Sequence, residues 1–89
     1  MTREEQKEYM IKMLETIVNI PSPSGYTREV MDYLTKEAWA LGYQAERNNK
    51  GGIIILVPGK TENILGIGAH GDTLGAMVRS VTSKGYLKI

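Results

Sequence analysis

The sequence predicts an α/β fold in which two helices precede several short strands. Up to Leu41 the apolar residues recur every three or four positions, which is the period of a helix. After Gly42 they alternate with polar residues or form short runs, as they do in strands. With 89 residues, of which 42% are hydrophobic and 24% charged, the chain has the composition of one small globular domain.

The first helix is expected to begin at Thr2. Thr2 and Glu5 have the spacing of a capping box, in which each residue satisfies a free backbone N–H of the other. The apolar residues that follow share one helical face: Met10, Met13, Leu14, Ile17 and Val18. Residues 19–25 end the helix, because Pro21 and Pro23 disfavour helical conformation in the residues before them.

A second helix is predicted after this loop, with Ser24 or Thr27 as its N-cap. Its apolar stripe consists of Val30, Met31, Leu34, Ala38 and Leu41. Gly42 stands where a left-handed residue commonly ends a helix. Trp39, near the end of this helix, is expected to cover the edge of the sheet.

The strands are predicted from residue 43 onward. Residues 43–47 alternate as a half-buried or edge strand does, and residues 48–52 form a turn. Residues 53–57 are a continuous apolar run, which predicts a strand covered on both faces. A second apolar strand is expected over residues 63–69. Two further strands are expected over 76–81 and 86–89, and because the last one has no polar tail, we expect the chain to be truncated.

Composition and charge narrow the classes of partner. The formal net charge is +1, with acids and bases interspersed, so neither a nucleic acid nor a membrane is an expected partner. The chain has no cysteine, which excludes disulfides and thiolate ligands and favours a cytoplasmic location. The polar amino terminus predicts no signal peptide and no transmembrane segment.

His70 and Asp72 are the candidate site residues. His70 is the only histidine, and it follows an apolar run. In an extended backbone, residues i and i+2 point to the same side, so His70 and Asp72 can share one face. A neutral imidazole can bind a metal ion, and a nearby carboxylate can hold its tautomer by accepting its other N–H. The alternative is a structural histidine in an ordinary hydrogen bond. Small residues at 68, 69 and 71 leave room for an ion and favour the metal site.

Two further motifs have simpler explanations. Residues 66–71 match the G-x-G-x-x-G pattern of dinucleotide-binding proteins, but that pattern requires a following helix, and the residues after it alternate like a strand. We therefore expect no nucleotide site. The Pro- and Ser-rich residues 19–25 have the composition of an ordinary connection between helices, and we expect no catalytic role for them.

Taken in order, several segments resemble the amino-terminal part of the TET-type dinuclear-metal aminopeptidases, also known as glutamyl or deblocking aminopeptidases and named endoglucanases in some cases. The similar segments are residues 19–25, Gly51-Gly52, residues 84–87 and, most specifically, residues 68–78 (Gly-Ala-His-Gly-Asp-Thr-Leu-Gly-Ala-Met-Val). The resemblance spans essentially the whole chain.

The resemblance implies a fold, a function and roles for two residues. Residues 1–72 would supply the two helices and opening strands of a zinc-peptidase (phosphorylase/hydrolase-like) sheet, and residues 73–89 would begin an inserted β-rich assembly domain. His70 matches the first metal ligand. Asp72, the candidate catalytic residue, matches the carboxylate that orients this histidine. The full-length enzyme would hold two zinc or cobalt ions, hydrolyse peptides from their amino terminus and form a homo-oligomer.

The resemblance also implies that the other ligands and a general-base glutamate lie beyond residue 89. Because stable zinc sites use three or four protein ligands, we expect the isolated chain to be inactive and to bind metal weakly. Two alternatives stay open. One is an autonomous small domain with a structural or interaction role. The other is part of an H-x-D deacylase or carboxypeptidase, although those enzymes more often continue with valine and proline than with Leu74-Gly75.

Overall fold

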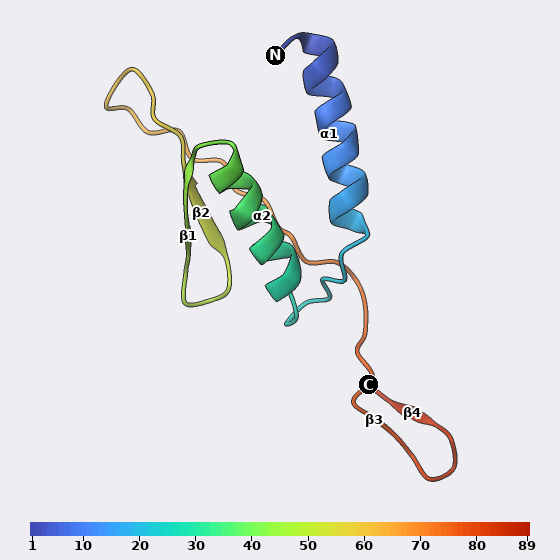
Figure 1. The fold of residues 1–89 in the computed structure, drawn as a ribbon. Coiled ribbons are helices and arrows are strands. Elements are labelled where there is room, and N and C mark those ends of the chain that lie inside the picture. Colours follow the sequence, from blue (N-terminus) through green and yellow to red (C-terminus); the bar gives the residue numbers. More distant parts are fainter.

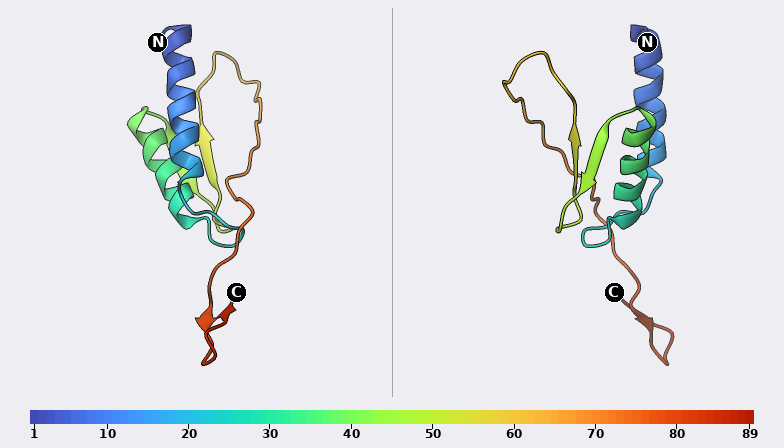
Figure 2. Two further views of the ribbon diagram at one scale, coloured as in Figure 1. Left: turned by 90° about the vertical axis from the view of Figure 1, so that its right-hand side faces the viewer. Right: turned by 60° about the vertical axis from the view of Figure 1, so that its left-hand side comes forward.

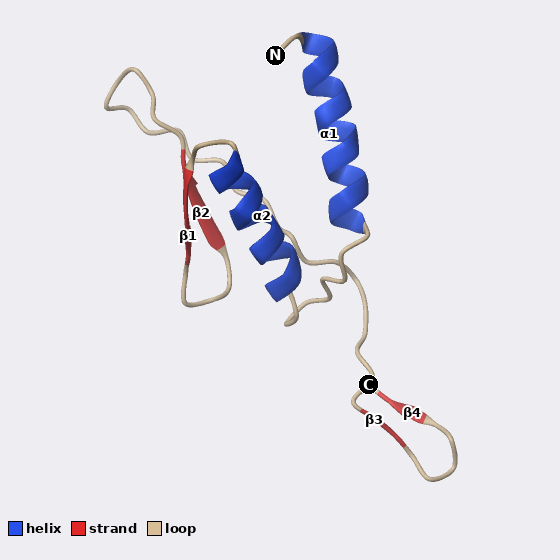
Figure 3. Ribbon diagram, viewed as in Figure 1, coloured by secondary structure: helices blue, strands red, loops and turns tan.

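The computed structural model describes residues 1–89 and contains two helices and two small antiparallel sheets (Figure 1). In chain order the elements are α1 (Arg3–Val18), α2 (Arg28–Ala40), β1 (Gln44–Arg47), β2 (Ile53–Leu56), β3 (Ser80–Val81) and β4 (Leu87–Lys88). β1 pairs with β2, and β3 pairs with β4. Figure 3 shows that a long stretch without helix or strand joins the two sheets.

α1 begins as the sequence predicts. The Thr2 hydroxyl accepts the Glu5 N–H at 3.1 Å, and the Glu5 carboxylate accepts the Thr2 N–H at 3.3 Å, which confirms the capping box. The apolar face of α1 is not covered, since no residue of α1 is buried and Met10, Leu14 and Val18 are each more than half exposed. α1 thus forms from its own sequence signals, with little packing behind it.

The core lies between α2 and the β1–β2 hairpin. Val30 and Ala38 of α2 and Ala45 of β1 are the buried apolar residues, and Val30 is completely inaccessible. The indole Nε1 of Trp39 donates to the carbonyl of Ala45 at 3.2 Å, so Trp39 contacts β1, while its side chain stays more than half exposed. Gly42 follows the helix with φ of 87°, as predicted for a left-handed ending. Figure 2 shows α2 lying along the hairpin.

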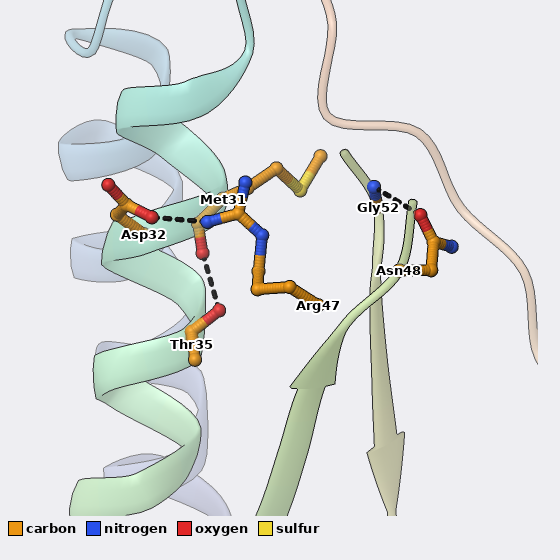
Figure 4. Close-up of polar contacts among 6 residues, drawn as sticks. All are labelled: Met31, Asp32, Thr35, Arg47, Asn48 and Gly52. Carbon is orange, nitrogen blue, oxygen red and sulfur yellow. Dashed lines mark hydrogen bonds and ion pairs between the residues drawn. The ribbon is translucent and has the colours of Figure 1, made fainter. Parts of the chain in front are cut away.

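The β1–β2 hairpin is set by its turn. Ala45 is paired with Ile55 and Arg47 with Ile53, so the strands are in register across their whole length. In the turn, the side-chain oxygen of Asn48 accepts the N–H groups of Lys50 and Gly52 at 3.0 and 2.9 Å. Figure 4 shows the Asn48–Gly52 bond beside two contacts that α2 makes: Arg47 pairs with Asp32, and the Thr35 hydroxyl donates to the Met31 carbonyl.

Several predicted features of the strands are wrong. β2 is not covered on both faces, because Ile54 and Leu56 are 64% and 60% exposed. Residues 63–69 form no strand and are exposed throughout. The expected strands at 76–81 and 86–89 are reduced to the two-residue β3 and β4. An apolar run becomes a strand only where a neighbouring strand accepts its hydrogen bonds, and here residues 63–69 have no such neighbour.

The molecule is extended. It measures 62 × 32 × 19 Å, and its radius of gyration is 17.3 Å, whereas a compact chain of this length has about 12 Å. Its accessible surface is 8198 Å², against roughly 5,200 Å² for a compact monomer of this mass. The loop after β2 and the β3–β4 hairpin both project away from the helices (Figure 1). Neither helix has both the length and the apolar character needed to cross a membrane.

Candidate functional site

His70 and Asp72 are brought together as the sequence predicts. The Nδ1 atom of His70 lies 3.0 Å from carboxylate oxygen Oδ1 of Asp72 and also 3.0 Å from the backbone carbonyl of Asp72. The imidazole is otherwise open, with 85% of the His70 side chain exposed against 42% of the Asp72 side chain. Asp72 therefore contacts the imidazole at Nδ1, and the rest of the ring faces solvent.

This geometry defines the tautomer of His70. Both atoms close to Nδ1 are oxygens that can only accept a hydrogen bond, so a neutral imidazole must carry its proton on Nδ1. Nε2 then keeps its lone pair, which is the form in which an imidazole nitrogen binds a metal ion.

Ser24 belongs to this site, although no sequence pattern singles it out as a site residue. Its hydroxyl donates to the second carboxylate oxygen, Oδ2, of Asp72 at 2.6 Å, across 48 positions of sequence. From their composition, residues 19–25 are predicted to act only as a connection between helices. A serine in a Pro-Ser-Pro-Ser-Gly segment is so common in turns that only its spatial contact with Asp72 distinguishes it.

The loop and the site segment are joined through their backbones as well. The Thr73 N–H donates to the Ser22 carbonyl at 2.8 Å, and Pro23 and Thr73 form an isolated parallel β-bridge. A Cβ atom on Gly75 would lie 3.1 Å from Cβ of Pro23, so this glycine permits the close approach. Figures 1 and 2 show the chain crossing the connection between α1 and α2 at this point.

The position of the site therefore differs from the expected one. The sequence predicts that His70 and Asp72 follow an apolar strand over residues 63–69, but these residues are exposed and unpaired. What holds Asp72 is the contact with residues 22–24 instead. Beside this contact lies an open cleft of about 430 Å³ between the loop and residues 73–77, and the buried Ser22 hydroxyl, which has no hydrogen-bond partner, belongs to its lining.

The same contacts keep Asp72 ionised. The hydrogen bond from Ser24, followed by the one from His70, lowers the pKa of the Asp72 carboxyl below its ordinary value. Hydrogen bonds that favour the charged form act in this direction. Asp72 is thus an acceptor on both of its oxygens near neutral pH.

The residues present match one end of a metal site. His70 offers one nitrogen ligand with its orienting carboxylate, which fits the donor chemistry of zinc or cobalt. The structure contains no group of three or more His, Cys, Asp or Glu side chains placed to hold a metal ion. A complete zinc site would therefore need ligands in addition to those of residues 1–89.

Comparisons with known proteins point to one enzyme family. The chain is 40% identical over 80 residues to the Bacillus subtilis (strain 168) protein named "Putative aminopeptidase YhfE". It is 33% identical over 78 residues to the glutamyl aminopeptidase of Lactococcus lactis subsp. cremoris (strain MG1363). These matches cover 89% and 85% of this chain but only 23% and 22% of the two relatives, so the chain spans less than a quarter of their length.

No protein-family model matches the chain, and no solved structure matches it at a significant level. The two curated matches agree with each other in naming an aminopeptidase, and each extends over most of this chain. They confirm the family resemblance predicted from residues 19–25 and 68–78. Over most of its own length, the chain is thus similar to part of two proteins that are both named aminopeptidases.

Proposed function

We propose that this chain contributes part of the metal centre of a metal-dependent aminopeptidase, with His70 as a metal ligand and Asp72 as the residue that orients it. One observation supports this most strongly. Asp72 occupies Nδ1 of His70 with acceptor oxygens and leaves Nε2 exposed with a lone pair.

The substrates proposed are peptides with a free amino terminus, because both relatives are named aminopeptidases. Two divalent ions, zinc or cobalt, would polarise the scissile carbonyl and lower the pKa of a bound water when present. The role of residues 1–89 in this chemistry is to position one imidazole nitrogen. Asp72 holds the ring orientation and keeps the proton on Nδ1.

We further propose that the other metal ligands and the general-base glutamate come from polypeptide beyond residues 1–89. The relatives are more than four times as long as the matched segment, which leaves ample room for these groups. A single exposed imidazole binds zinc weakly, so the chain by itself should be inactive. We place the protein in the cytoplasm and expect the complete enzyme to be a homo-oligomer.

The division into two domains is also a proposal. Residues 1–72 would belong to the catalytic domain, a part of a zinc-peptidase sheet, and residues 73–89 would begin an inserted β-rich domain. The observation in its favour is that the β3–β4 hairpin pairs only with itself and projects from the body (Figure 2), although Thr73, the first residue of the proposed inserted domain, is still bonded to Ser22.

A chimera tests the proposed function. The matching segment of the Lactococcus glutamyl aminopeptidase would be replaced by this chain, and hydrolysis of a peptide with an amino-terminal glutamate would be measured. We expect an active enzyme. Asp72→Ala should lower kcat about 10–100-fold, as is usual for residues that orient a metal ligand, and His70→Ala should lower it further.

The control is Lys60→Ala, an exposed change in the loop after β2 that should leave kcat unaltered. The same replacement in the Bacillus relative covers the case in which the first chimera does not fold. A folded chimera that stays fully active with His70→Ala would contradict the proposal.

A second candidate function is that of an autonomous domain with an interaction role. The observation in its favour is the extensive apolar surface on α1 and β2. It predicts self-association of the chain together with folded but inactive chimeras.

A further inference from the structure

We propose that Ser24 is a positioning residue for His70, acting through Asp72. Its hydroxyl fixes the plane of the Asp72 carboxylate, and this in turn keeps the His70 proton on Nδ1 and leaves Nε2 free. The purpose of this arrangement, metal binding by Nε2, rests on the proposed function. The positioning itself depends only on contacts within the chain.

Each carboxylate oxygen of Asp72 has a different partner. Oδ2 accepts the Ser24 hydroxyl at 2.6 Å, and Oδ1 lies 3.0 Å from Nδ1 of His70. The carboxylate torsion of an aspartate is broad, so a single contact would leave the group free to rotate. Two contacts on opposite oxygens define its plane, and only then does Oδ1 face the imidazole continuously.

Ser24 is itself held in place by the loop around it. The Tyr26 N–H donates to the Pro23 carbonyl at 2.8 Å, closing a tight turn around Ser24, and Gly25 supplies the positive φ of 87° that this turn uses. The Thr73–Ser22 bond and the Pro23–Thr73 bridge then fix the turn against the segment that contains Asp72. The serine hydroxyl is thus presented by a rigid loop.

Without the Ser24 hydroxyl, the Asp72 carboxylate loses one of its two contacts. In Ser24→Ala, Oδ2 would have water as its partner, and the carboxylate could turn Oδ1 away from His70. The backbone carbonyl of Asp72 would be the remaining acceptor at Nδ1. The imidazole should then move toward the Nε2–H tautomer, which an unconstrained imidazole favours, and fewer molecules would have a free Nε2.

The tautomer can be measured directly in the 89-residue chain by ¹⁵N NMR of the imidazole. Because His70 is the only histidine, the imidazole signals need no residue assignment, and couplings to the carbon-bound ring protons distinguish Nδ1 from Nε2. The spectra are recorded at a pH above which the imidazole signals no longer change, so that only the two neutral forms contribute. We expect the Nδ1–H form to dominate in the unsubstituted chain and its ratio to the Nε2–H form to fall about two- to tenfold in Ser24→Ala, the range of one net hydrogen bond.

Two control variants separate the hydroxyl from the loop. Ser22→Ala removes a hydroxyl that has no hydrogen-bond partner in the same loop and should leave the tautomer ratio unchanged. Ser24→Thr keeps a hydroxyl at position 24 and should restore the ratio. The amide signals of Val30 and Ala45, in the core between α2 and β1, report whether each variant is folded.

An unchanged tautomer ratio in folded Ser24→Ala would overturn the inference. If Ser24→Ala does not fold, the unsubstituted chain gives the result: a nuclear Overhauser effect between the β protons of Ser24 and Asp72 is expected, and its absence would contradict the proposal. A tautomer shift in Ser24→Ala combined with undiminished metal content in a His70→Ala chimera would preserve the positioning role and refute the proposed function.

Discussion

At the scale of single residues, the site consists of one imidazole whose two nitrogens have different surroundings. Nδ1 faces two acceptor oxygens of Asp72, and Nε2 faces solvent. The sequence predicted His70 and Asp72 because residues i and i+2 of an extended backbone share a face and because small neighbouring residues leave room for an ion. It could not predict Ser24, since the contact of Ser24 with Asp72 depends on how a loop and a segment 48 positions apart fold together.

The exposure of His70 leads to a prediction about stability. His70→Ala should change the free energy of unfolding by about 0.5 kcal/mol or less in the absence of metal, as surface substitutions usually do. Urea unfolding followed by circular dichroism measures this change. A loss of several kcal/mol would instead indicate a buried, hydrogen-bonded structural histidine, in conflict with the 85% exposure of its side chain.

At the scale of elements, α2 and the β1–β2 hairpin form the packed part of the molecule, and α1 is attached more loosely. The sequence located both helices because their caps and periods are local signals. It overestimated the strands because a strand requires a partner that no local pattern specifies. Residues 53–57 have the apolar run of a fully covered strand, yet nothing within residues 1–89 covers the exposed face of β2.

The stability of the core between α2 and the β1–β2 hairpin should depend on the Val30 side chain. Val30→Ala removes buried methyl groups from a completely inaccessible side chain, and we expect it to lower the free energy of unfolding by about 1.5–2.5 kcal/mol. The matched control is Val18→Ala in α1, where the side chain is 62% exposed and little should change. Equal effects of the two substitutions in urea unfolding would show that the α2–β1 core is not the main source of stability.

The contact between α1 and α2 should weaken at alkaline pH. The Tyr9 hydroxyl donates to the Glu37 carboxylate at 2.6 Å, and this bond raises the pKa of Tyr9 from 10.0 to about 12. A raised pKa means that the bond stabilises the fold fully below pH 10 and that this contribution is lost as the pH rises through about 12.

Spectrophotometric titration of the five tyrosines provides the measurement. Tyr9→Phe should remove the most alkaline step of the absorbance curve, and Tyr86→Phe, on the distant β3–β4 hairpin, should leave it in place. A curve for Tyr9→Phe that retains this step would contradict the proposed attachment.

At the scale of the whole molecule, the excess of accessible surface is the dominant feature. The chain exposes roughly 3,000 Å² more than a compact monomer of its mass, which is within the range that obligate interfaces bury. Part of this surface is apolar and lies on β2, whose outer edge is unpaired. The composition alone predicted an ordinary globular domain, because composition does not reveal whether apolar residues find neighbours.

We therefore expect the isolated chain to self-associate. Sedimentation velocity at increasing concentration should show dimers or larger species, and Leu56→Lys on β2 should weaken the association, since a charge on an edge strand opposes pairing. Leu87→Lys, on the separate β3–β4 sheet, is the control. A folded monomer at high concentration would contradict this expectation.

The central claim is that His70 ligates a metal ion in an aminopeptidase. The most direct test is the metal content of the purified Lactococcus chimera, measured by mass spectrometry with and without His70→Ala. We expect zinc or cobalt in the unsubstituted chimera and a clear loss of at least one ion per chain in a folded His70→Ala variant. Equal metal content in the two proteins would contradict the claim.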